Sequence, residues 1–128
     1  MNEFLTLAPK ISDALSNNRP VVALESTLIT HGLPDPVNIE TALEMEETVR
    51  KAGALPAIIG IVEGRIRIGL TPGEIASMLA SGRRVLKVSR RDLAFVVSQG
   101  LDGGTTVAAT MICARLAGIR IFATGGIG

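Results

Sequence analysis

The sequence predicts a layered α/β/α fold around a mostly parallel central sheet. Three stretches, at 21–26, 55–62 and 119–124, are largely apolar with little polar alternation, which is typical of strands covered by helices on both faces. Segments with helix-capping residues alternate with these strands along the chain. Strands that alternate with helices favour a parallel sheet between two helical layers.

The composition indicates one soluble domain over residues 1–128. The chain is 47% hydrophobic with a formal net charge of +1, so it offers no electrostatic surface for nucleic acid or membrane. No signal-peptide pattern is present, and no apolar run approaches the roughly 18 residues of a membrane span. The single cysteine, Cys113, lies among apolar residues and is expected to be a small buried hydrophobe. We therefore expect a cytoplasmic protein.

The first predicted strand, Val21–Ser26, leads into a loop that contains several prolines. Within that loop, Asp35 and Pro36 have the sequence of a helix cap followed by the first helical residue. We expect this helix to run to about Ala52.

A hairpin and a capped helix follow. The apolar strand 55–62 turns at a Glu-Gly pair into 65–70, where arginines alternate with isoleucines as on a half-exposed strand. The next segment predicts a helix, because Thr71 provides the cap, Pro72 the first residue and Glu74 the capping box.

The remaining elements end in glycine-rich segments. Residues 84–89 predict a short strand, and Ser89 with Asp92 predicts a short helix, for which the β-branched middle leaves a strand as the alternative. Residues 102–118 predict a buried, almost wholly apolar helix opened by glycines and threonines. The last strand and its loop occupy 119–126.

Three polar residues lie where predicted strands end. Glu25 ends the first strand, Lys87 lies near the end of the 84–89 strand, and Thr124 is followed by Gly125 and Gly126 after the last. Ligands of open α/β sheets bind beyond the carboxyl ends of the strands, so we expect one shared rim.

Each of these residues has a functional and a structural interpretation. A carboxylate that follows an apolar strand would be partly desolvated, which suits Glu25 to general acid or base work. Its structural alternative is a helix cap or an ion pair with an arginine. Lys87 is suited to a phosphate or carboxylate, and its alternative is an exposed lysine on an edge strand.

Other ligand motifs are weak or absent. The "GGTTV" stretch precedes a helix N-terminus, where free amides attract anions, but neither a Walker sequence nor GxGxxG occurs. His31 is the only histidine and Cys113 the only cysteine, so no cluster of nitrogen and sulfur metal ligands is expected. We interpret His31 as structural.

Longer motifs resemble one family. "ALESTLITHGLPDPVNIE", "GALPAIIGIVEGRIRIGLT", "KVSRRDL", "GLDGGTTVAATM" and "AGIRIFATGGIG" occur in the order found in the pseudouridine-5'-phosphate glycosidase family, also called the indigoidine synthase A family. The resemblance covers nearly the whole chain from about Pro9. It implies reversible cleavage of the carbon–carbon glycosidic bond of pseudouridine 5'-phosphate to uracil and ribose 5-phosphate, with Mn²⁺ as cofactor and a homotrimeric assembly.

The resemblance also implies roles for individual residues. Glu25, in the "EST" motif, matches the proton donor of the family, while Lys87 and Val107 match substrate-binding positions. Thr106 and Thr124 match positions expected to line the ligand pocket. Uracil is a poor leaving group from carbon, so an acid that delivers a proton there is chemically required.

Family chains run to well over twice this length. The lysine nucleophile and the aspartate that binds the metal are expected beyond Gly128, so the sequence predicts an N-terminal part that is inactive by itself. Two alternatives remain at this stage: a binding module for a sugar phosphate or nucleotide, and one half of a split enzyme.

Overall fold

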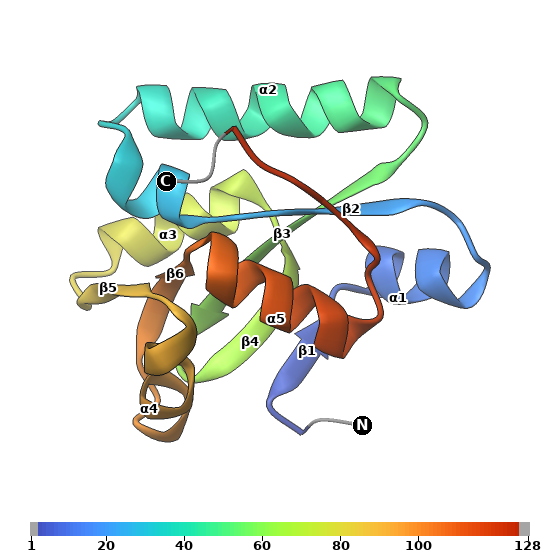
Figure 1. The fold of residues 1–128 in the computed structure, drawn as a ribbon. Helices are drawn as coiled ribbons and strands as arrows, with labels where there is room; N and C mark the ends of the chain where they lie inside the picture. Colours follow the sequence, from blue (N-terminus) through green and yellow to red (C-terminus); the bar gives the residue numbers. More distant parts are fainter. Residues whose placement is uncertain (1–2, 126–128) are drawn as a thin grey trace.

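The computed structural model describes residues 3–125, and the predicted loop residue Gly126 lies outside them. Strands of one sheet lie between helices on both sides (Figure 1). In chain order the elements are β1 (Leu5–Leu7), α1 (Pro9–Ser16), β2 (Val21–Leu24), the π-helical turn η1 (Leu28–Gly32), α2 (Val37–Lys51), β3 (Leu55–Val62), β4 (Arg65–Leu70), α3 (Pro72–Ala80), β5 (Val85–Val88), the 3₁₀ turn η2 (Arg90–Asp92), α4 (Leu93–Ser98), β6 (Asp102–Thr105), α5 (Val107–Ala117) and β7 (Ile121–Ala123).

The sheet is mostly parallel, as predicted. Its main path runs β1-β4-β3-β2-β7, and β6 joins it by pairing with β3 and with β5. The pairs β1/β4, β2/β3, β2/β7 and β5/β6 are parallel, whereas β3/β4 and β3/β6 are antiparallel.

One edge of β3 is shared by two strands that approach from opposite directions. β2 pairs in parallel with the first half of β3 and reaches Ile58 with Leu24. β6 pairs antiparallel with the second half, where Gly104 lies opposite Gly60. The carboxyl ends of β2 and β6 therefore face each other beside Ile59.

Apolar side chains of β3 alternate between the two faces of the sheet, and each face has its own core. Ile59 and Ile61 pack in one core with residues of α1, α4 and α5, whereas Ile58 packs in the other with residues of α2 and α3. This arrangement confirms the predicted α/β/α layering.

The predicted hairpin and the helix that follows it are confirmed. Ile66 and Ile68 are buried between exposed or half-exposed arginines of β4. At the start of α3, the Glu74 amide donates to Thr71 Oγ1 and the Thr71 amide donates to Glu74 Oε1, both at 3.0 Å. This capping box satisfies amides that the first helical turn leaves without a partner.

The predicted start of α2 is wrong by one residue. Pro36, and not Asp35, is the N-cap residue, and no side chain caps the helix. The Asn38 amide already donates to the Pro34 carbonyl at 2.9 Å, so the backbone closes the first turn without the Asp35 carboxylate.

The segment 102–105 is a strand, which corrects the prediction that it opens a helix. β6 pairs with β5 on one side and β3 on the other, and its residues are all buried. The helix begins only at Val107, with Thr106 as its N-cap.

The expectation that α5 is buried also fails. Among the described residues of this helix, Met111 is 56% exposed and Leu116 is 49% exposed.

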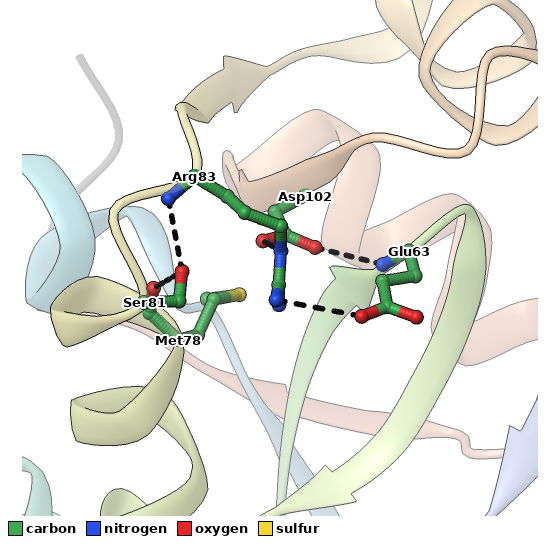
Figure 2. Close-up of polar contacts among 5 residues, drawn as sticks. All are labelled: Glu63, Met78, Ser81, Arg83 and Asp102. Atoms are coloured by element: carbon green, nitrogen blue, oxygen red, sulfur yellow. Dashed lines mark hydrogen bonds and ion pairs between the residues drawn. The ribbon is translucent and has the colours of Figure 1, made fainter.

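A buried carboxylate anchors the start of β6 (Figure 2). Asp102 accepts hydrogen bonds from the Glu63 amide at 2.7 Å and from Arg83 Nε at 2.8 Å. The Arg83 guanidinium also lies 3.4 Å from the Glu63 carboxylate, and the Arg83 amide donates to Ser81 Oγ. These contacts connect the β3–β4 turn, the loop before β5 and the first residue of β6.

Candidate active site

Four strand ends meet around the gap between β2 and β6. β7 runs parallel to β2, so Ala123 lies beside Leu24, and β5 runs parallel to β6, so Val88 lies beside Thr105. All four strands thus point their carboxyl ends toward the same gap. The topology places there the loops that carry the predicted site residues.

Glu25 and Thr124 lie in direct contact across the ends of β2 and β7. The hydroxyl of Thr124 donates to Oε1 of Glu25 at 2.5 Å. Glu25 is half-buried and directly follows Leu24, which is 2% exposed. The contact follows from the strand register, since Glu25 and Thr124 directly follow Leu24 and Ala123, which lie opposite each other in β2 and β7.

Thr106 and Val107 lie at the start of α5, on the opposite side of the gap. The Thr106 amide donates to the Val88 carbonyl at 3.0 Å, and Thr106 Oγ1 accepts from the Ala109 amide. α5 spans eleven residues, so its first amides and its dipole present a partial positive charge here. The geometry therefore provides a place where an anion would be stabilised.

Lys87 lies one residue before the end of β5, in register with Gly104. Its side chain is exposed and makes no hydrogen bond or ion pair with another residue in the range 3–125. It borders a hollow of about 400 Å³ with Asp92 and Phe95. The structure brings Lys87 to the same gap as Glu25, from the opposite side, but not into contact with it.

The remaining hydroxyl groups near Glu25 differ in their bonding. Ser26 and Thr105 are buried and hydrogen-bonded to each other, although the sequence analysis did not select them. The one signal that the sequence offers for them is their position, because Ser26 is adjacent to Glu25 and Thr105 is adjacent to Thr106. By contrast, Thr27 Oγ1 is buried without a hydrogen-bond partner among the described residues.

His31 has the structural contacts that were expected of it. Its Nδ1 lies 2.6 Å from Thr30 Oγ1, and its Nε2 lies 3.1 Å from the carbonyl of Val85. These contacts join η1 to β5. The imidazole thereby helps to fix the loop that follows Glu25 against the strand that carries Lys87.

A groove of about 490 Å³ opens beside Thr124. It lies between α2 and the end of β7, and its lining is mainly apolar. The residues that border it are Leu24, Leu28, Thr41, Glu44, Met45, Thr48, Val49, Ala123, Thr124 and Gly125.

Residues 3–125 hold no group of three or more histidine, cysteine, aspartate or glutamate side chains that could bind a metal ion. In the same part of the chain, no helix has the length and apolar character needed to cross a bilayer.

Residues 10–128 match the family model described as indigoidine synthase A like protein. The chain belongs to the indigoidine synthase A family. Among members of this family, the pseudouridine-5'-phosphate glycosidase of Escherichia coli K12 is 58% identical over 98% of this chain and 40% of its own length. A pseudouridine-metabolizing bifunctional protein of Schizosaccharomyces pombe is 56% identical over 97% of this chain and 17% of its own length.

Solved structures agree with this placement in the indigoidine synthase A family. The prealnumycin C-glycosynthase AlnA, in complex with ribulose 5-phosphate, superposes with a TM-score of 0.86 at 45% identity. An indigoidine synthase A-like protein of Thermotoga maritima superposes with a TM-score of 0.84 at 32% identity. Both matches cover 100% of this chain, and 41% and 42% of those chains. The chain thus spans about two fifths of the length of the relatives it matches most fully.

Proposed function

We propose that this chain is the part of a pseudouridine-5'-phosphate glycosidase that carries the proton donor. The observation that supports this most directly is the half-buried Glu25 carboxylate, held by Thr124 where four strand ends meet. The chain is also 58% identical to the Escherichia coli enzyme of that name over nearly its whole length.

In the proposed reaction, pseudouridine 5'-phosphate and water give uracil and ribose 5-phosphate. The carbon–carbon bond between base and sugar breaks, the pyrimidine carbon takes a proton, and the hydroxyl of water ends on the anomeric carbon. Glu25 is the proposed source of that proton. Because Thr124 donates to Oε1 of Glu25, the acidic proton is expected on Oε2.

The proposed substrate contacts lie around Glu25. The amides at the start of α5, next to Thr106 and Val107, are suited to the phosphate group, and the Lys87 ammonium adds a positive charge on the same side of the gap. Thr124 is proposed to border the substrate as well as to orient Glu25.

The remaining family properties are also proposals for this protein. We propose Mn²⁺ as cofactor, a homotrimeric assembly and a cytoplasmic location. The described residues do not fit a manganese site, since they contain no cluster of suitable ligands, so the metal ligand and the lysine nucleophile are proposed to lie outside them. No step assigned to Glu25 involves the metal.

A chimera tests this proposal. Residues 1–128 are joined to the part of the Escherichia coli relative that lies beyond the matched segment, and uracil release from pseudouridine 5'-phosphate is followed with added Mn²⁺. We expect release by the chimera and none by the 128-residue chain. Glu25→Gln in the chimera should lower kcat by about 10²- to 10⁴-fold, the usual contribution of general acid catalysis.

The matched control is Glu47→Gln, an exposed carboxylate on α2 that should leave kcat unchanged. Full activity of the Glu25→Gln chimera would contradict the assigned role. Saturable binding of ribose 5-phosphate by the 128-residue chain, with an inactive chimera, would support a sugar-phosphate binding module instead.

A further inference from the structure

Ser26 and Thr105 connect the two sides of the gap through a buried hydrogen-bond network. Both side chains are fully buried, as is that of Thr110 in α5. The Thr105 amide donates to Ser26 Oγ at 2.8 Å, and the Thr105 hydroxyl donates to the Ile59 carbonyl at 2.7 Å. The residues after Glu25 and before Thr106 are thereby bonded to each other and to β3.

The chemistry of the groups allows one arrangement of the protons. Because the Thr105 hydroxyl hydrogen points to Ile59, its oxygen must accept from its other neighbours. Those neighbours are Thr110 Oγ1 at 2.8 Å and Ser26 Oγ at 3.3 Å, so both hydroxyls donate to Thr105. Each hydroxyl hydrogen thus has an acceptor, and a fully satisfied buried network of this kind favours one geometry.

Two glycines make room for the segment that follows Glu25. A Cβ atom on Gly60 would lie 3.3 Å from Ser26 Oγ and 2.8 Å from Leu70 Cδ1. A Cβ atom on Gly104 would lie 2.0 Å from Thr30 Oγ1. The segment that follows Glu25 therefore packs directly on the backbone of β3 and β6.

We propose that Ser26 and Thr105 are positioning residues that set the place of Glu25 relative to the start of α5. The inference rests on the proposed function, because it assumes that Glu25 delivers a proton to a substrate held near Thr106. Neither positioning residue needs to touch the substrate. Ser26 is adjacent to the acid, Thr105 is adjacent to the anion-stabilising amides, and 79 residues separate them in the chain.

The first test uses the chimera with Thr105→Val, which keeps the shape of the side chain and removes its hydroxyl. We expect kcat to fall by about 10- to 100-fold, the order of loss that a misplacement of about 1 Å produces. KM should change less than kcat, and Thr105→Ser, which restores the hydroxyl, should recover most of the rate. Ser98→Ala, which removes an exposed hydroxyl of α4 that bonds only the Phe95 carbonyl, is the control.

The second test uses nuclear magnetic resonance on the 128-residue chain with Ser26→Ala, which removes one oxygen. We expect faster hydrogen exchange of the Thr105 amide and a shifted Glu25 side-chain carboxyl resonance, with the Glu47 carboxyl resonance unchanged. Ser98→Ala, at an exposed hydroxyl that bonds only the Phe95 carbonyl, is the control.

The outcomes separate this inference from the proposed function. If the unsubstituted chimera is inactive, the proposed function fails and the resonance measurements alone decide whether Ser26 and Thr105 position Glu25. If the chimera is active and Thr105→Val retains its kcat, the inference is overturned. Unchanged Thr105 exchange and an unchanged Glu25 resonance in Ser26→Ala would overturn it as well.

Discussion

Cys113 shows at the residue scale how burial changes the chemistry of a side chain. It lies on the covered face of α5 and is fully buried, as expected of a small hydrophobe. Desolvation raises the pKa of its thiol from 9.0 to about 11. Since the thiolate is the reactive form, Cys113 should react with a thiol reagent much more slowly in the folded chain than in denaturant.

The same shift predicts a pH dependence of stability. The pKa of Cys113 is higher in the folded chain than in the unfolded chain. The stabilisation that comes from burying its neutral thiol is therefore complete below pH 9 and is lost as pH rises toward 11. The free energy of unfolding of the native sequence should therefore decline in this window relative to Cys113→Ala, by on the order of 2 kcal/mol. Chemical denaturation between pH 9 and pH 11 measures this free energy. If it depended on pH in the same way in the native sequence and in Cys113→Ala, the prediction would be contradicted.

Residue positions near the gap were predictable where strand ends determine them. Glu25 and Thr124 follow apolar strands, and parallel register alone brings them together. Ser26 and Thr105 were not predictable in this way. Their contact depends on β2 and β6 approaching β3 from opposite directions, and no local sequence pattern encodes the direction of a distant strand.

At the scale of elements, β6 is where sequence and structure differ most. Gly103 and Gly104 were predicted to open a helix and not to form a strand, because glycine weakens strands. In the structure, the missing side chains leave space for Val88 on one face and Thr30 on the other, and pairing on both edges offsets the weak propensity. The hairpin and α3 were predicted correctly because their turn and capping residues act locally.

Gly104→Ala tests this packing. The new Cβ would lie 2.0 Å from Thr30 Oγ1 and 3.0 Å from Thr30 Cβ, so rotating the Thr30 side chain cannot relieve the clash. We expect a loss of about 1–3 kcal/mol in the free energy of unfolding, as overpacked cores show.

Gly73→Ala, measured by the same denaturation, is a control of opposite sign. Gly73 lies in α3 with its nearest neighbour at 3.8 Å, so alanine should stabilise the helix by about 0.5–1 kcal/mol. Equal effects of the two substitutions would contradict the proposed close approach of η1 to β6.

At the scale of the whole molecule, apolar side chains are exposed on α5 and β7. Met111 and Ile121 are each 56% exposed, and a hollow of about 820 Å³ lies between these two elements. β7 pairs only with β2 among the described strands, so its other edge also presents unpaired backbone groups. Exposed strand edges next to apolar surface promote association.

Ile121→Lys should therefore reduce self-association of the 128-residue chain. Analytical ultracentrifugation over a range of concentrations measures it, and Phe95→Lys, at a similarly exposed apolar residue on α4, is the control. A larger effect of Phe95→Lys would show that association involves α4 instead of β7.

The meeting of β2 and β6 on β3 also bears on the order of folding. The hairpin, α3 and β5 lie in the chain between Ser26 and Thr105, so the contact of these two residues closes a loop of 79 residues. Closing so long a loop is slow, so the contact between Ser26 and Thr105 is expected to form late in folding and to open early when the protein unfolds partially. In such a partly folded state, Glu25 would not yet face the start of α5 across the gap. The proposed proton donor would reach its position only in the last stage of folding.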